Sequence, residues 1–139
     1  MERIPCEFSV EINYTDLNIN NITSGPQLFS EVEGQLLIYI NNKVIFSEKE
    51  ILLLELAKQL KDWLHNYDKD FYYESMDYED SPILFFKRIN LNNWQISGIW
   101  MNRTYANIKL SDLMFACNSF IDKLIIDLNL REINTKDLF

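Results

Sequence analysis

The stretch SEKEILLLELAKQLKDWLHNY, residues 47–67, decides the fold because it carries the clearest helical signal in the chain. Its apolar side chains recur at spacings of three and four, which places them on one face of a helix. That face comprises Leu53, Leu56, Ala57, Leu60, Trp63, Leu64 and Tyr67. Leu52 and Leu54 widen the face, so we expect the helix to be covered on more than one side. Ser47 and Glu50 have the spacing of a capping box and predict that the helix begins there.

The segments before this helix alternate between apolar and polar residues, as half-buried strands do. Residues 6–13 and 28–40 show the pattern, whereas the Asn-rich stretch 16–26 ends in Gly-Pro and predicts a surface loop. Asn41 and Asn42 predict a tight hairpin turn, because asparagine tolerates the left-handed conformations that two-residue turns require. A short return strand then leads to the helix.

Three further strand-like runs follow the helix, at 71–78, 83–89 and 94–101. Short turns separate them, and short turns join antiparallel neighbours, so we expect a meander. Another short strand is expected at 104–109.

A second helix is predicted near the end of the chain, with Ser111 or Asp112 as its cap. On its outer side Lys123 and Asp127 stand four residues apart, a spacing at which they can pair weakly. Its apolar face comprises Leu113, Cys117, Phe120, Ile121, Leu124 and Leu128.

Strands in runs with helices between them indicate an α+β fold. We predict a single domain over residues 1–139, with one antiparallel sheet of about five to six strands and two helices packed on one face. Two helices cannot cover both faces of such a sheet, so the other face should meet water or a partner.

The net charge of the chain is −8, which repels nucleic-acid phosphates and favours a basic protein partner. Cys6 and Cys117 are expected to be buried free thiols. The first residues lack the pattern of a secretory signal, and the apolar run at 51–57 is too short to span a bilayer. We therefore expect a cytoplasmic protein without a membrane segment.

Catalytic signals are weak. His65 is the single histidine, and a place near the end of a helix explains it through the helix dipole. Glu74 with Asp77 or Asp80 is the candidate carboxylate pair, but a hairpin turn favours solvated carboxylates over a raised pKa. The glycines are isolated, and the D-x-D motif at 68–70 lacks the glycine and glutamate of a calcium loop. We predict no enzyme, no cofactor and no metal.

An acidic and aromatic segment, residues 68–80, remains to be explained. It holds six acidic residues against one lysine, a net charge of −5. One interpretation is a solvated hairpin whose carboxylates protect a sheet edge. The other is a contact surface, in which aromatic rings supply area and carboxylates bind Lys and Arg. The candidate partner-binding residues are Asp70, Tyr72, Tyr73, Glu74, Asp77, Tyr78, Glu79 and Asp80.

The chain is small, acidic and rich in Asn and Ile, with a predicted α+β fold and no catalytic motif. In this overall character it resembles the immunity proteins of bacterial polymorphic or contact-dependent toxin systems. The resemblance implies that it binds one cognate toxin, often a basic nuclease domain, and blocks or covers the active site. It rests on no single motif and assigns no individual residue.

Three alternatives stay open. A pocket between sheet and helices, lined by Tyr73, Trp94, Trp100 and His65, would suit a small-molecule-binding or enzymatic domain. A phage-encoded inhibitor of a host nuclease or defence protein would use the same acidic surface. An exposed aromatic sheet face could also be buried in a homodimer.

Overall fold

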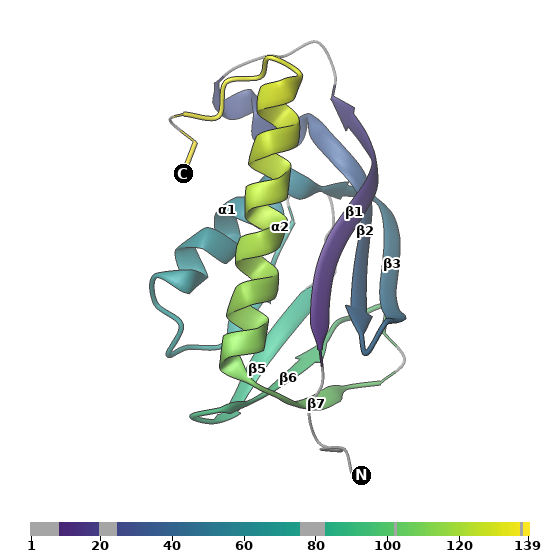
Figure 1. The fold of residues 1–139 in the computed structure, drawn as a ribbon, viewed down its shortest axis with the longest axis vertical. Helices are drawn as coiled ribbons and strands as arrows, with labels where there is room; N and C mark the ends of the chain where they lie inside the picture. The colour runs from purple at the N-terminus through teal and green to yellow at the C-terminus, as the bar shows by residue number, and fades with distance from the viewer. Residues whose placement is uncertain (1–8, 20–24, 76–82, 102, 137) are drawn as a thin grey trace, which may run out of the picture.

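The structure is a computed structural model, and it describes residues 9–19, 25–75, 83–101, 103–136 and 138–139. Within these ranges the chain forms one α+β domain with two α-helices and two antiparallel sheets (Figure 1). The predicted fold class is confirmed. The prediction of one sheet with five to six strands is wrong, because the described strands divide into a sheet of three and a sheet of four.

The first sheet has the order β1-β2-β3. Its strands are β1 (Val10–Ile19), β2 (Val32–Ile40) and β3 (Lys43–Leu52). Buried and half-buried residues alternate along β2, as its sequence predicts. Asn41 and Asn42 have φ angles of 53° and 68°, so the predicted hairpin turn is confirmed.

Two boundaries in this half of the chain differ from the prediction. β1 continues to Ile19, through a register shift at which Asp16 takes a φ of 58°, so part of the expected loop is strand. A 3-10 helix, η1 (Pro26–Ser30), follows. The predicted strand at residues 6–8 and the thiol of Cys6 lie outside the described residues.

The expected capping box is also wrong. β3 runs on to Leu52, and α1 (Leu53–Leu64) begins only there, without a side-chain cap. Ser47 and Glu48 instead pair with β2. A local capping signal is a weak preference, and here the pairing with β2 overrides it.

α1 is covered on several sides, as its wide apolar face predicts. Its fully buried residues are Leu53, Leu54, Leu56, Ala57 and Leu60. It contacts β2, η1, β4 (Phe71–Tyr73) and the second helix, α2 (Leu110–Leu130).

The second sheet is the expected meander, in the order β4-β5-β6-β7. Its later strands are β5 (Leu84–Asn90), β6 (Asn93–Ser97) and β7 (Tyr105–Ile108). Because β3 leads directly into α1, the chain does not return beside β3. β4 runs back along the helix instead and begins a second ladder with β5.

α2 lies along β1 (Figure 1). It begins at Leu110 after Lys109, without a side-chain cap, so the predicted caps Ser111 and Asp112 are already helical. Its buried residues include the whole predicted apolar face, Leu113, Cys117, Phe120, Ile121, Leu124 and Leu128, and also Ala116. Of the helices in the described ranges, none is long and apolar enough to cross a membrane.

Lys123 and Asp127 both contact Tyr14 of β1, where the sequence suggested that they pair with each other. The ammonium of Lys123 lies 4.2 Å from the centre of the Tyr14 ring and donates to Asn13 Oδ1 over 2.6 Å. The Tyr14 hydroxyl donates to Asp127, and Arg131 donates to the carbonyl of Leu17 over 3.4 Å. Three α2 residues spaced by four therefore fix the helix to β1.

Gly34, near the start of β2, should not tolerate a side chain. A Cβ added there would lie 2.6 Å from Leu53 Cδ1 and 2.9 Å from the carbonyl oxygen of Thr15. Since the second contact is with backbone, we expect Gly34→Ala to lower the free energy of unfolding by about 1 to 3 kcal/mol, measured by urea denaturation. Asp122→Ala, on the exposed side of α2, is the control and should change little. An unchanged urea midpoint for Gly34→Ala would contradict this expectation, because it would mean that the first sheet and α1 can move apart without loss of stability.

Tyr14 should make stability sensitive to alkaline pH. Burial, and then the hydrogen bond and charge of Asp127, raise the pKa of its hydroxyl above the usual 10.0. Its stabilising contribution is complete below pH 10.0 and is lost above it, because the unfolded chain then releases a proton that the folded chain retains. We expect Tyr14→Phe to lower the free energy of unfolding by about 1 to 3 kcal/mol at pH 7, with a smaller deficit at pH 11.

Urea titrations between pH 7 and 11 measure this effect. Tyr67→Phe, at a tyrosine that is 44% exposed, is the matched control. A Tyr14→Phe deficit that stays constant over the pH range would contradict the assigned role of the Asp127 bond.

Candidate functional site

A groove lies between α1 and β4. It is lined by residues of α1 and by the described part of the acidic, aromatic segment. Its volume is about 360 Å³. Its lining combines carboxylates, amides, Lys69 and aromatic rings. The residues used below are Gln59, Asp62, Trp63, Asp70, Phe71 and Tyr72.

α1 holds the backbone of this segment through side chains spaced by four. Gln59 makes two hydrogen bonds with the backbone of Glu74: its Nε2 donates to the carbonyl over 3.0 Å, and its Oε1 accepts from the amide over 3.3 Å. Trp63 Nε1 donates to the carbonyl of Lys69 over 2.7 Å. At the other end, the Tyr73 hydroxyl donates to Glu55 over 2.8 Å. These bonds fix the segment to the helix within the folded chain.

Trp63 and Phe71, which line the groove, belong to a cluster of packed aromatic rings that continues into the core. The ring centre of Trp63 lies 6.0 Å from that of Phe71, 5.6 Å from Phe86 and 5.4 Å from Trp94. Phe71 and Phe86, which face each other across β4 and β5, are 5.0 Å apart. This aromatic cluster occupies the space between the second sheet and α1.

The pocket that sequence reasoning placed between sheet and helices does not form from its expected residues. Tyr73 and Trp94 are fully buried in the core. Trp100 packs on Phe46 of the other sheet at 6.3 Å, and His65 is exposed at the end of α1. These four side chains do not converge on one site.

The predicted partner-binding residues have different fates. Tyr72 is 51% exposed, and its ring stacks on Phe85 at 4.7 Å with an interplanar angle of 14°. Glu74 is also exposed. Tyr73 is fully buried, so including it in a contact surface was wrong: alternate residues of a strand point to opposite sides. The remaining predicted residues, Asp77, Tyr78, Glu79 and Asp80, lie outside the described residues.

The charge of the described surface is mixed. Asp70 is partly exposed, and its Oδ1 accepts a hydrogen bond from the Arg88 amide over 2.8 Å. Lys87 and Arg88 are exposed on the neighbouring strand β5. The surface around the described part of the segment is therefore less negative than the segment's own sequence suggests, because two cations of β5 lie beside it.

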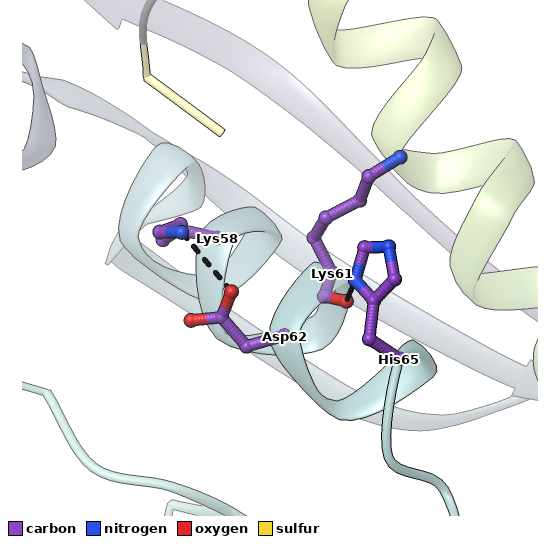
Figure 2. Close-up of polar contacts among 4 residues, drawn as sticks. All are labelled: Lys58, Lys61, Asp62 and His65. Atoms are coloured by element: carbon purple, nitrogen blue, oxygen red, sulfur yellow. Dashed lines mark hydrogen bonds and ion pairs between the residues drawn. The ribbon is translucent and has the colours of Figure 1, made fainter.

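Asp62 also lines the groove, although nothing in the sequence assigned it a role. Lys58 donates to its carboxylate over 3.0 Å, one helical turn away (Figure 2). The Asp62 side chain is 62% exposed and that of Lys58 38%, so the pair contributes little to stability and Asp62 stays accessible. Asp62 precedes Trp63 in the sequence, and both line the groove. This placement could be recognised only after the structure showed that this part of α1 lies beside β4.

His65 is not among the residues that line the groove. Its Nδ1 lies 3.0 Å from the carbonyl oxygen of Lys61, so the ring hydrogen-bonds within the last turn of α1 (Figure 2). Cys117 is buried, and burial raises the pKa of its thiol, which disfavours the nucleophilic thiolate. Among the residues described, no three His, Cys, Asp or Glu side chains are grouped so as to hold a metal ion.

The fold and the groove define a small α+β domain with a preformed aromatic surface of mixed charge. The chain belongs to the family described as a domain of unknown function, DUF7878, whose model matches residues 8–130. Neither the curated proteins nor the solved structures contain a match to it.

Two tryptophans of the aromatic cluster should respond differently to the same substitution. Trp63 Nε1 has an acceptor, whereas Trp94 Nε1 is buried with no partner among the described residues. Both substitutions to Phe remove similar volume, but only Trp63→Phe removes a hydrogen bond and leaves the carbonyl of Lys69 without its donor. We expect Trp63→Phe to destabilise by about 1 kcal/mol more than Trp94→Phe.

Urea unfolding followed by circular dichroism measures the difference without relying on tryptophan fluorescence. An equal or larger loss for Trp94→Phe would contradict the expectation and would indicate that its indole N–H is satisfied in solution.

Proposed function

We propose that the protein is an inhibitory binding domain that neutralises a basic protein partner, a nuclease-type bacterial toxin domain, as immunity proteins do. The observation that carries the proposal is the exposed Tyr72 at the rim of the groove, held by its stack on Phe85. Exposed tyrosine on a fixed backbone is typical of binding hot spots, since it supplies area with little loss of conformational entropy.

The anchoring by α1 supports the same proposal. Gln59 and Trp63 fix the backbone on both sides of Tyr72, so a partner need not order this segment on binding. Preorganisation of this kind favours affinity because the entropic cost of ordering has already been met in folding.

Electrostatics supports a basic partner. The net charge of −8 attracts a cationic protein over long distances, although Lys87 and Arg88 make the described surface locally mixed. Glu74, exposed beside Tyr72, can accept charge-assisted hydrogen bonds from Lys or Arg. The net charge thus favours encounter, while Tyr72 and Glu74 supply contacts.

Affinity capture from cells of the native host tests the proposal. Tagged wild-type protein and a Tyr72→Ala variant are compared, and the proposal expects a basic protein that the wild type retains and the variant loses. Growth of cells that express the captured protein alone is then compared with growth of cells that co-express the wild-type chain, and the co-expression should restore growth. Recovery of no basic partner, or growth that the chain does not protect, would overturn the toxin assignment.

Once the partner is purified, substitutions of Tyr72 and Glu74 should affect different rate constants of binding. We expect Tyr72→Ala to weaken binding by about thirtyfold, chiefly through faster dissociation. Glu74→Lys should slow association at low salt, with a smaller effect at high salt. Surface plasmon resonance at several salt concentrations measures both.

Two controls accompany this experiment. Tyr72→Phe keeps the stack on Phe85 and should bind more tightly than Tyr72→Ala. Asp122→Lys makes the same charge change as Glu74→Lys on the exposed side of α2. Equal effects of Asp122→Lys and Glu74→Lys would place the interface elsewhere.

A further inference from the structure

A second groove opens between the β2–β3 turn and β7. Its volume is about 380 Å³, and its lining includes Asn41, Lys43, Val44, Arg103 and Tyr105. Two cations therefore share one concave surface in a chain whose net charge is −8. No aspartate or glutamate occurs among the described residues that line it.

Neither cation is neutralised within the described part of the chain. Arg103 lies over the ring of Tyr105, with its guanidinium carbon 5.0 Å from the ring centre. Neither Arg103 nor Lys43 forms an ion pair with a carboxylate of the described residues. The ring orients the guanidinium without using its N–H groups, so these donors remain for a ligand.

The turn beside the cations is fixed. Asn41 exchanges two hydrogen bonds with Ser9, each 2.9 Å long: its amide donates to the Ser9 carbonyl, and its Oδ1 accepts from the Ser9 amide. Because Oδ1 is used in this way, the Nδ2 group of Asn41 is a further donor in the lining. Lys43 follows the turn as the first residue of β3.

Apolar side chains complete the lining. Ile40 is 5% exposed and forms part of the core, while Val44 is 52% exposed. A ligand in this groove would therefore meet charge and apolar surface together. The volume lies within the range of small-molecule sites, about 300 to 1,000 Å³.

We propose that this groove binds a small phosphate monoester whose organic part is apolar or planar. Two cations match the two charges of the phosphate, and the guanidinium fork and the Asn41 amide supply directed donors. Val44 and the ring of Tyr105 contact the organic part. This site is separate from the groove between α1 and β4.

Isothermal titration calorimetry of the full chain tests the proposal with three probes: phenyl phosphate, inorganic phosphate and benzoate. Phenyl phosphate should bind saturably at one site, and the other two at least about tenfold more weakly, because each lacks either the organic part or the second charge. Equal binding of inorganic phosphate would overturn the role of the organic part. Equal binding of benzoate would overturn the match to a dianion.

Variants locate the site. Arg103→Gln and Lys43→Gln should each weaken phenyl phosphate binding by about tenfold or more, whereas Lys87→Gln, the same charge change on β5, should leave it unchanged. Amide chemical shifts of Lys43, Val44 and Tyr105 should move on titration of the wild type. Absence of saturable binding, or full binding by Arg103→Gln that keeps the wild-type circular dichroism, would overturn the proposal.

Discussion

The burial of α1 between the two sheets is the constraint on which the rest of the structure depends. Residues 53–57, at the start of α1, are all buried, so this end of the helix is enclosed on every side and cannot lie on one sheet with its far side in water. In this chain β2 and η1 cover one side of α1, and β4 and α2 cover others. The division into two sheets follows from this requirement, since one flat sheet could not enclose the helix.

Both helices add directional bonds to this apolar burial in the same way. On α1, Glu55, Gln59 and Trp63 bond to Tyr73, Glu74 and Lys69. On α2, Lys123, Asp127 and Arg131 bond to Asn13, Tyr14 and Leu17. Side chains four residues apart lie one above another on a helix, so each row can follow a neighbouring extended segment. Apolar burial brings helix and strand together, and these bonds set the register between them.

The sequence predicts local features of this fold better than the arrangement of its strands. The β2–β3 turn, the meander and the buried face of α2 follow from periodicity and from residues such as Asn41, which act over a few positions. The capping box at Ser47 failed because strand pairing outweighs a local preference. The break between the sheets depends on what covers α1, which no periodicity records. The groove was missed for the same reason, since Asp62 and Trp63 gain their roles only once β4 lies beside them.

Tyr72 and Tyr73 show why composition alone could not define the candidate surface. They are neighbours of the same type, yet one is 51% exposed on a stack and the other is fully buried with its hydroxyl on Glu55. The inward tyrosine fixes the phase of the strand, and the phase determines that its neighbour faces outward. The outward position is therefore open to substitution, whereas the inward one is constrained by the core. For the proposed partner contact, position 72 is thus the place in β4 where a substitution can alter the exposed surface while Tyr73 and its bond to Glu55 are kept.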